Sequence, residues 1–340
     1  MTTRVGLMGF GRIGRNVFRM LHGHPGLEVA AIADIVDPAG LTYLLKYDSI
    51  YGRFPMPVVL EGNDLFVDGR RVPFLNDREP GDTAWAAHGV DIVIQATTRY
   101  RTMAEASRHL DAGAKRVIVA STPATPGDIP ILLRGINDDI LDEHPGVIAL
   151  GSNTSNALAP ILRVLDRGFG LERAFFTTVH AMTNTQRLAD VPSEGFRQSR
   201  AAGENIIPSE TNSAEILIQV MPEFAGKLKG SALNVPVPDG STVDLVAETR
   251  EATSKESVNA AVKSAALATY AGIVEYSEDP IVSSDVRTAT VSAVYDSLAT
   301  TVMDGTIVKT ITWFNNGWGY TARAIEVMER MAAELEGVRA

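Results

Sequence analysis

The sequence predicts an α/β domain built on a parallel sheet, followed by an α+β domain, in a chain of 340 residues. The first prediction rests on short apolar runs that alternate with helical patterns up to residue 150, as in repeated βαβ units. The second rests on longer strand-like runs with fewer helical crossovers after that point, which indicate a mixed or antiparallel sheet. Two domains suit the length, because single hydrophobic cores stop growing near about 250–300 residues.

The elements of the first half follow from apolar periodicity. Residues 3–8 (TRVGLM) are predicted to form a short strand, and residues 12–22 carry apolar side chains at helical spacing. Three further strands are predicted at 27–34, 91–96 and 116–120. One further helix is predicted at 101–113. Strands separated by helices in this way form a parallel sheet.

The second half is expected to contain longer strands with helices on one face of the sheet. The strand-like runs are 173–180, 231–237, 241–248 and 306–314, and the helical stretches are 156–168, 213–221 and 254–269. Residues 318–338 read as an amphipathic helix that could return to the first domain.

Composition excludes several classes of function. The formal net charge of −10 argues against binding to nucleic acids or anionic membranes, because both require a basic face. No run approaches the roughly 18 apolar residues that span a bilayer, and Met1 leads within two residues into a strand, so no signal peptide is expected. No His, Asp and Glu cluster has the spacing of metal ligands, so no metal is expected. The expected compartment is the cytoplasm.

The chain contains no cysteine. This excludes disulfides, Cys-ligated zinc and a thiol nucleophile. Any covalent chemistry would therefore have to use a weaker nucleophile.

A glycine-rich loop indicates a dinucleotide site of the Rossmann type. Gly9, Gly11 and Gly14 form G-x-G-x-x-G between a predicted strand and a predicted helix, and Asp34 follows Gly14 by twenty residues at the end of the next strand. The glycines permit a tight turn, a close approach of the pyrophosphate and close helix packing, while Asp34 would accept ribose hydroxyl hydrogen bonds and repel a 2′-phosphate. NAD is therefore favoured over NADP, and the alternative is a glycine-punctuated turn without a ligand.

Ten segments along nearly the whole chain resemble the glyceraldehyde-3-phosphate dehydrogenase family. They are GFGRIGR (9–15), LLKYDSIYGRF (44–54), GVDIVIQATTRY (89–100), AGAKRVIVAS (112–121), SNTSNALAP (152–160), TTVHAMTNTQRLAD (177–190), RAAGENIIPSETNSAE (200–215), VPVPDGSTVDLV (235–246), PIVSSD (280–285) and WFNNGWGY (313–320). The resemblance implies a Rossmann NAD-binding domain of residues 1–150 plus 316–340, an inserted α+β catalytic domain of residues 151–315, and a homotetramer.

The resemblance also implies a set of NAD contacts. Besides Gly9, Gly11, Gly14 and Asp34, the positions that match family cofactor contacts are Arg12, Ile13, Arg78, Thr97, Tyr100, Ser121 and Asn316. Arg78 and Tyr100 would flank the adenine, and Asn316 matches the asparagine that holds the nicotinamide carboxamide.

The catalytic positions depart from the family pattern. The family's cysteine nucleophile aligns with Asn153, whereas its histidine base is retained as His180. An amide cannot replace a thiolate, because its nitrogen lone pair is delocalised into the carbonyl. The hydroxyls of Ser152, Thr154 and Ser155 have a far higher pKa than a thiol, and capping of the next helix is favoured over a nucleophilic role.

The positions that match the family's substrate contacts also depart from the family pattern. An arginine that recognises phosphate becomes Asn234, a second one aligns with Gln198, an aspartate becomes Thr185 and a glycine becomes Asn212. The remaining candidate hydroxyl donors of the substrate site are Thr154, Thr183 and Thr211. Losing a charge-assisted Arg contact argues against a triose phosphate held in the family's manner.

Three functions remain open. The favoured one is an NAD-dependent oxidoreductase with cysteine-independent chemistry on an aldehyde or alcohol, with His180 as general acid/base and Asn153 as a donor to the substrate oxygen. The alternative is a catalytically silent NAD-binding pseudoenzyme with a regulatory or sensor role. A silenced enzyme that still binds its old substrate fits the other substitutions poorly. For His180 the structural alternative is a histidine satisfied by backbone at a strand end, and the other five histidines are interpreted as surface or loop residues.

Overall fold

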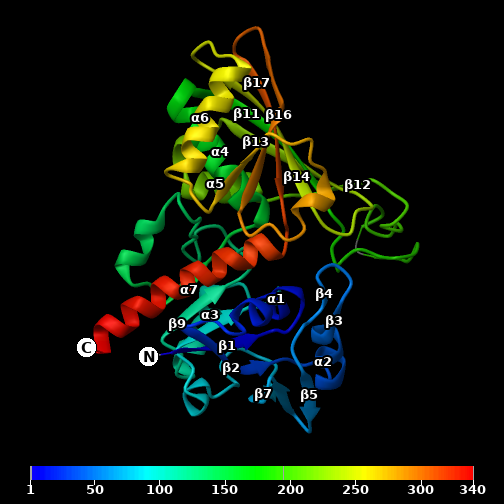
Figure 1. The fold of residues 1–340 in the computed structure, drawn as a ribbon, viewed down its shortest axis with the longest axis vertical. Coiled ribbons are helices and arrows are strands. Elements are labelled where there is room, and N and C mark those ends of the chain that lie inside the picture. The colour runs from blue at the N-terminus through cyan, green and yellow to red at the C-terminus, as the bar shows by residue number, and fades with distance from the viewer. Residues whose placement is uncertain (1, 194, 340) are drawn as a thin grey trace. The chain divides into compact units, whose positions relative to one another are not determined.

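The computed structural model describes residues 2–193 and 195–339, and the chain divides into two compact units (Figure 1). The first unit consists of Met1–Leu132, Asn137–Gly151 and Thr321–Ala340, and the second of Leu133–Ile136 and Ser152–Tyr320. Residues 316–320, which we expected in the nucleotide-binding domain, belong to the second unit. The predicted fold class, α/β with an inserted α+β domain, is confirmed.

The first unit is built on an eight-stranded sheet of order β10-β9-β8-β1-β2-β7-β6-β5. Its parallel strands are β1 (Thr3–Met8), β2 (Leu27–Ala33), β7 (Arg70–Leu75), β8 (Ile92–Gln95), β9 (Arg116–Val119) and β10 (Val147–Ala149), and β5 (Val58–Glu61) and β6 (Asp64–Val67) add antiparallel pairs at the edge. The chain builds outward from β1 on one side through β2, then on the other through β8. This reversal of strand order is the switch point at which α/β sheets bind ligands.

The helices of this unit are α1 (Arg12–Leu21), α2 (Pro38–Lys46), α3 (Met103–Asp111) and the 3₁₀ turns η1 (Trp85–His88) and η2 (Asp138–Glu143), with a short ribbon of β3 (Tyr47–Asp48) and β4 (Gly52–Arg53). Thr102 caps the amino end of α3 and forms a complete capping box with Glu105. Helix α7 (Trp318–Arg339) ends the described chain.

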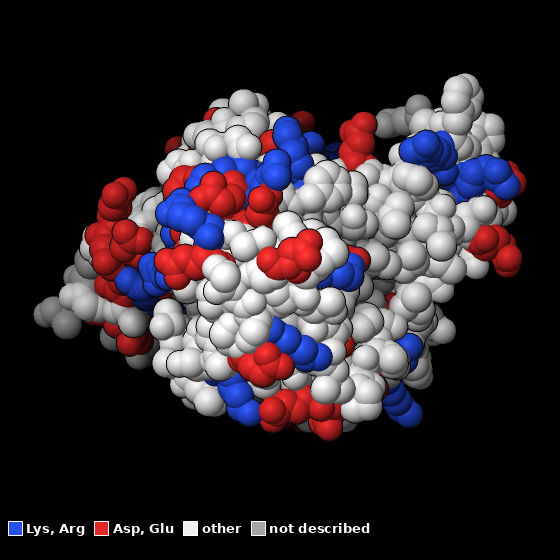
Figure 2. All heavy atoms as spheres, turned by 90° about the horizontal axis from the view of Figure 1, so that it is seen from above, with Lys and Arg blue, Asp and Glu red and all other residues white. Residues whose placement is uncertain are grey.

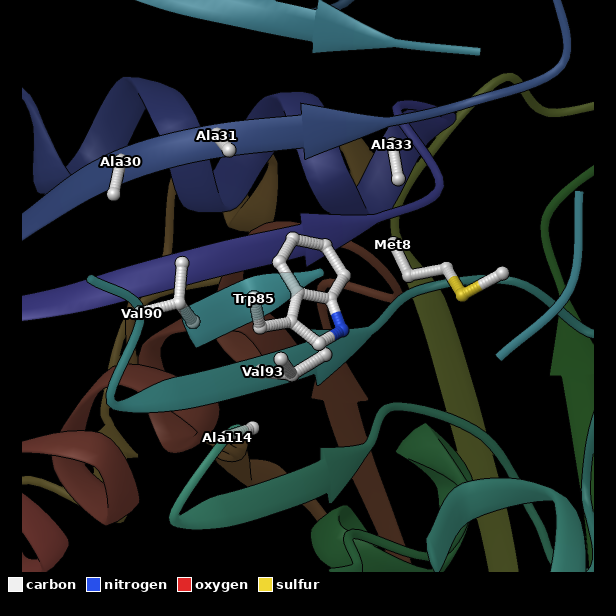
Figure 3. Packing of buried hydrophobic residues seen from close by; sticks show 8 residues of the cluster. All are labelled: Met8, Ala30, Ala31, Ala33, Trp85, Val90, Val93 and Ala114. Carbon is white, nitrogen blue, oxygen red and sulfur yellow. The ribbon is translucent and has the colours of Figure 1, made fainter. Parts of the chain in front are cut away.

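One apolar cluster of the first unit packs around Trp85. Small side chains on β2, Ala30, Ala31 and Ala33, leave room for the indole ring, which lies over β1 (Figure 3). A Cβ on Gly6 would lie 2.7 Å from the indole Cζ3, so only glycine permits this packing.

His109 departs from the sequence interpretation, which made it a surface or loop residue. It is fully buried on α3, where it accepts a hydrogen bond from Trp85 Nε1 at 2.9 Å and pairs through Nε2 with Gln95 Oε1 at 3.2 Å. Both ring nitrogens thus have partners, which is why a polar ring is stable in this core.

The second unit is built on a seven-stranded mixed sheet of order β12-β13-β11-β14-β17-β16-β15. The strands are β11 (Leu171–His180), β12 (Ile207–Ser209), β13 (Leu228–Asn234), β14 (Ser241–Thr249), β15 (Val274–Ser277), β16 (Ala293–Met303) and β17 (Ile307–Phe314). Only the β11–β13 and β15–β16 pairs are parallel.

Helices α4 (Asn153–Phe169), α5 (Ser213–Val220) and α6 (Lys255–Leu267) lie on one face of this sheet (Figure 1), and η3 (Pro222–Phe224) and η4 (Ser283–Val286) are 3₁₀ turns. The carboxyl end of β11 and the amino ends of α4 and α5 carry the polar residues considered below.

Neither a bilayer-spanning helix nor a metal-binding group of side chains occurs within the described part of the chain. Its helices lack the length and hydrophobicity that a span requires, and its His, Asp and Glu residues form no cluster of three suited to an ion. On the face shown in Figure 2, Lys and Arg are interspersed with Asp and Glu, and the coloured residues form no continuous basic patch.

Candidate active site

The glycine loop between β1 and α1 has a different steric demand at each glycine. Gly9 adopts φ +96°, a conformation that side chains disfavour. A Cβ on Gly14 would lie 2.1 Å from the Gly9 carbonyl oxygen, so α1 packs directly on the turn. A Cβ on Gly11 would meet no atom within 4 Å. The open backbone at Gly11, ahead of a ten-residue helix, fits a pyrophosphate cradle.

Asp34 follows β2 and holds the glycine loop in place. Its Oδ2 accepts a hydrogen bond from Phe10 N at 2.6 Å, and its Oδ1 accepts one from Val36 N at 2.9 Å. A carboxylate has about four acceptor sites, so two bonds to backbone leave capacity for ribose hydroxyls. Asp34 therefore has a structural role and keeps acceptor capacity for the ribose contact that the sequence predicts.

Five of the predicted cofactor residues line one small pocket of about 50 Å³ in the first unit. They are Gly9, Asp34, Arg78, Thr97 and Tyr100. The Tyr100 hydroxyl donates to the Arg78 carbonyl at 2.9 Å, so these two predicted adenine neighbours are joined.

The remaining predicted cofactor residues lie elsewhere. Arg12 and Ile13 form the first turn of α1, and Asn316 belongs to the second unit. Ser121 follows β9, and its Oγ is buried without a hydrogen-bond partner among the described residues. A buried hydroxyl without a partner is costly unless a ligand or water satisfies it. The residues present thus fit a dinucleotide.

All nine residues predicted for catalysis and substrate binding line a single cavity of about 910 Å³ in the second unit. They are Asn153, Thr154, His180, Thr183, Thr185, Gln198, Thr211, Asn212 and Asn234. The described lining is otherwise mainly hydroxyl and amide groups, and it contains no Lys or Arg. The cavity therefore offers many neutral hydrogen-bonding groups and no cationic partner for a phosphate.

Asn153 is the first residue of α4, and both ends of its amide are engaged. Its Nδ2 donates to the Asn316 carbonyl oxygen at 3.1 Å, and its Oδ1 accepts from Thr154 N at 2.8 Å. Ser152 caps the helix, with reciprocal 3.0 Å bonds between its Oγ and Ser155 N and between Ser155 Oγ and Ser152 N. The predicted capping role of these serines is confirmed.

His180 ends β11, and its tautomer is set by the next residue. Its Nδ1 lies 2.7 Å from the Ala181 carbonyl oxygen, which can only accept, so Nδ1 carries the proton. In the neutral ring, Nε2 is then the basic nitrogen. The Phe314 ring stands edge-on to the imidazole, with 6.1 Å between ring centroids.

Ser241 connects the His180 segment to Asn316. The fully buried Ser241 Oγ accepts from Ala181 N at 3.0 Å and donates to Asn316 Oδ1 at 3.5 Å. Because Asn316 also accepts from Asn153, the strand end that bears His180 and the helix start that bears Asn153 belong to one network. Ser241 lies in the segment VPVPDGSTVDLV, but nothing in the sequence marks its hydroxyl as a link between two other elements.

Hydroxyl pairs order the rest of the cavity wall. Thr183 and Thr185 share a 2.9 Å hydroxyl bond, and Thr211 donates to Ser213, whose hydroxyl lies 2.9 Å from Ser152. Asn234 Oδ1 accepts from Ser209 at 2.6 Å. The wall is a set of mutually bonded neutral groups.

Nine of the described lining residues were not among the predicted catalytic and substrate residues, and Ser209 and Glu210 are two of them. Glu210 is exposed and is the only carboxylate among the described lining residues. A single acidic residue in a loop has no spacing that marks it, so only the fold places it at the cavity.

Comparison with known proteins gives a consistent result for both halves of the chain. Residues 3–103 match the family model described as glyceraldehyde 3-phosphate dehydrogenase, NAD binding domain, and residues 152–316 match the model of its C-terminal domain. The chain is 45% identical over 335 residues to glyceraldehyde-3-phosphate dehydrogenase of Geobacillus stearothermophilus, covering 98% of this chain and 99% of that protein. It is 44% identical over 333 residues to glyceraldehyde-3-phosphate dehydrogenase 1 of Bacillus subtilis, a match that covers 98% of this chain and 99% of that protein. It is 45% identical over 342 residues to glyceraldehyde-3-phosphate dehydrogenase of Mycobacterium avium, a match that covers 98% of this chain and 100% of that protein.

Proposed function

Because the chain belongs to the glyceraldehyde-3-phosphate dehydrogenase family, whose cofactor is NAD, we propose that it is an NAD-dependent oxidoreductase that acts on an aldehyde or alcohol without a cysteine nucleophile. The observation that carries this proposal is the shared cavity of Asn153 and His180, joined through Ser241 and Asn316 in a chain without cysteine. The same residues argue against the phosphorylating reaction that the relatives' name implies.

The family position of the nucleophile, which aligns with Asn153, cannot support a thioester here. A thiolate adds to an aldehyde, and the oxidised adduct is then attacked by phosphate. The Asn153 nitrogen is not nucleophilic, and the nearby serine hydroxyls are engaged in capping α4. Hydride transfer must therefore occur without a covalent intermediate on this loop.

His180 would act as general base toward an alcohol or a hydrated aldehyde. With Nδ1–H donating to Ala181, the neutral ring presents its basic nitrogen as Nε2. The bond to Ala181 also stabilises the imidazolium that forms when the proton is taken. Bound NAD would supply the hydride acceptor for the same oxidation.

Asn153 would orient the reacting oxygen. An amide nitrogen has two N–H groups, and the bond to Asn316 uses one of them. The second would donate to the substrate oxygen as it gains or loses charge, as an oxyanion donor does. The fixed amide would lose little freedom on binding, because Thr154 N holds its oxygen.

The substrate would be unphosphorylated. A phosphate group is typically bound by arginine or lysine, and the described cavity lining has neither. An unphosphorylated polyol, amino alcohol or hydroxy acid, or the related aldehyde, would match the hydroxyl and amide lining.

The proposed assembly is a homotetramer in the cytoplasm. Within residues 184–208, the segment that resembles the family's tetramer loop, Phe196 is 99% exposed and Leu188 is 90% exposed. In the proposed tetramer, a neighbouring copy would cover these two side chains. Light scattering of the purified protein decides the number of copies.

The test compares turnover of Asn153→Ala and His180→Gln with that of the parent protein. Removing an oxyanion donor lowers kcat by about 10²–10³-fold, and removing a general base by about 10²–10⁴-fold. NADH affinity should change little in both variants. Asn205→Ala, in the loop outside the cavity, is the matched control and should keep full activity.

An unchanged kcat in Asn153→Ala would remove its role at the substrate oxygen. Tight NADH binding with no turnover of any aldehyde or alcohol would instead support the catalytically silent, regulatory alternative.

A further inference from the structure

Charge is distributed unevenly in the cavity of the second unit. Its described lining carries one carboxylate, Glu210, and one imidazole, His180, but no ammonium or guanidinium group. A ligand in this cavity therefore meets a local negative charge unless His180 is protonated. Coulomb interactions over a few ångströms are strong enough to discriminate among ligands of different charge.

The Glu210 carboxylate has no hydrogen-bond or ion-pair partner among the described residues. It lies in the exposed turn between β12, which ends at Ser209, and Asn212, which precedes α5. Neighbouring polar groups are committed: Ser209 donates to Asn234, and Thr211 accepts from Ser213 N at 3.2 Å. Glu210 is thus the ionic group of the wall that remains able to bind a ligand.

Glu210 also stands where an anion would otherwise be favoured. Helices α4 and α5 both begin at this cavity, at Asn153 and Ser213, and helix amino ends attract negative charge. A carboxylate three residues before Ser213 supplies that charge from the protein itself. An incoming phosphate would meet the carboxylate, whereas a cation would meet an unpaired partner.

We infer that Glu210 selects substrates by charge: the cavity accepts an aldehyde or alcohol that carries an ammonium group and rejects phosphate esters. This inference rests on the proposed function, since it names the substrate class of the same cavity. Among the compound classes that the hydroxyl and amide lining would accept, it favours amino alcohols over hydroxy acids.

The experiment measures binding of three probes of similar size and different charge to the full-length protein saturated with NADH. The probes are 3-aminopropane-1,2-diol, glycerol and glycerol 3-phosphate, and the readout is the change in NADH fluorescence, checked by thermal shift. We expect the ammonium probe to bind about three- to tenfold more tightly than glycerol, as for a charge-assisted contact that is partly screened by solvent. Glycerol 3-phosphate should bind most weakly.

Two variants of Glu210 and one control variant distinguish the effect of charge in the cavity from the effect of the protein's net charge. Glu210→Gln should remove the preference for the ammonium probe and leave glycerol unchanged, while Glu210→Lys should reverse the order so that glycerol 3-phosphate binds best. Glu204→Gln removes the same charge from an exposed loop glutamate outside the described cavity lining and should leave the order intact. The ammonium preference should also shrink as ionic strength rises.

Tighter binding of glycerol 3-phosphate than of the ammonium probe, or an order that Glu210→Lys leaves unchanged, would overturn the inference. These outcomes are independent of turnover. The predicted binding order without any oxidation would contradict the proposed function alone, whereas oxidation with a preference for phosphate esters would contradict the charge selection alone.

Discussion

At the scale of single residues, Asn153 carries the largest chemical consequence. Its amide donates to the Asn316 carbonyl and accepts from Thr154 N, so it is held rigidly at the first turn of α4. A side chain fixed in this way can position a substrate oxygen, but it cannot form a bond to carbon. In the proposed reaction, proton transfer would therefore fall to His180, and the charge and shape of the cavity would select the substrate.

His109 gives a residue-scale prediction that is independent of the active site. Burial lowers the pKa of His109 to about 4, with a smaller contribution from Arg108, whereas the unfolded chain has a pKa near 6.5. Between these values the unfolded chain binds a proton that the folded chain does not, so stability falls as the pH drops. We expect His109 to account for a loss of about 2 kcal/mol between pH 7.5 and 5.

Denaturant unfolding at several pH values measures this slope. His109→Asn should be less stable at pH 7.5, because Trp85 Nε1 loses its partner, and its stability should fall less steeply toward pH 5. His88→Asn, at a partly exposed histidine, should keep the parent slope. Equal slopes in the parent protein and His109→Asn would contradict a neutral buried imidazole.

At the scale of elements, the glycine loop between β1 and α1 serves two purposes: its glycines allow close packing of the backbone, and they leave space for the cofactor. Its context could be predicted from the sequence, because the spacing of Gly9, Gly11, Gly14 and Asp34 between a strand and a helix is specific. The long strand β16 (Ala293–Met303) could not be predicted from the sequence. Its polar and apolar residues do not alternate regularly, and Asp296 and Ser297 interrupt its apolar run. Pairing with β17 and β15 makes it a strand.

Two glycines of one loop should respond differently to alanine. Gly14→Ala should destabilise the protein by about 3 kcal/mol, because its Cβ would lie 2.1 Å from the Gly9 carbonyl oxygen. Gly11→Ala meets no protein atom within 4 Å and should leave the melting temperature unchanged, yet weaken NADH binding by about tenfold or more where the pyrophosphate approaches.

Thermal unfolding and NADH titration of both variants distinguish these effects. Unchanged NADH affinity in Gly11→Ala would contradict the pyrophosphate cradle. Unchanged stability in Gly14→Ala would contradict the close packing of α1 on the turn.

At the scale of the whole molecule, the sequence predicted the fold class, the residues of one cavity and the loss of its arginines, but not the carboxylate in its wall. Family motifs identified Asn153 and His180, which lie within recognisable segments, and Asn234, which directly precedes one. Glu210 and Ser241 also lie within such segments, but their roles were missed because these depend on which strand and helix ends meet, and no local pattern encodes that. The same limit applied to His109, whose burial follows from packing against Trp85 and Gln95.

The proposed function requires that this family member oxidises its substrate without a thiol and without phosphate. The most direct measurement is the formation of NADH, followed by its absorbance, from NAD and an unphosphorylated aldehyde or alcohol, with and without inorganic phosphate. We expect NADH to form at a rate that phosphate does not change. A strict requirement for phosphate together with glyceraldehyde 3-phosphate as the only active substrate would contradict it.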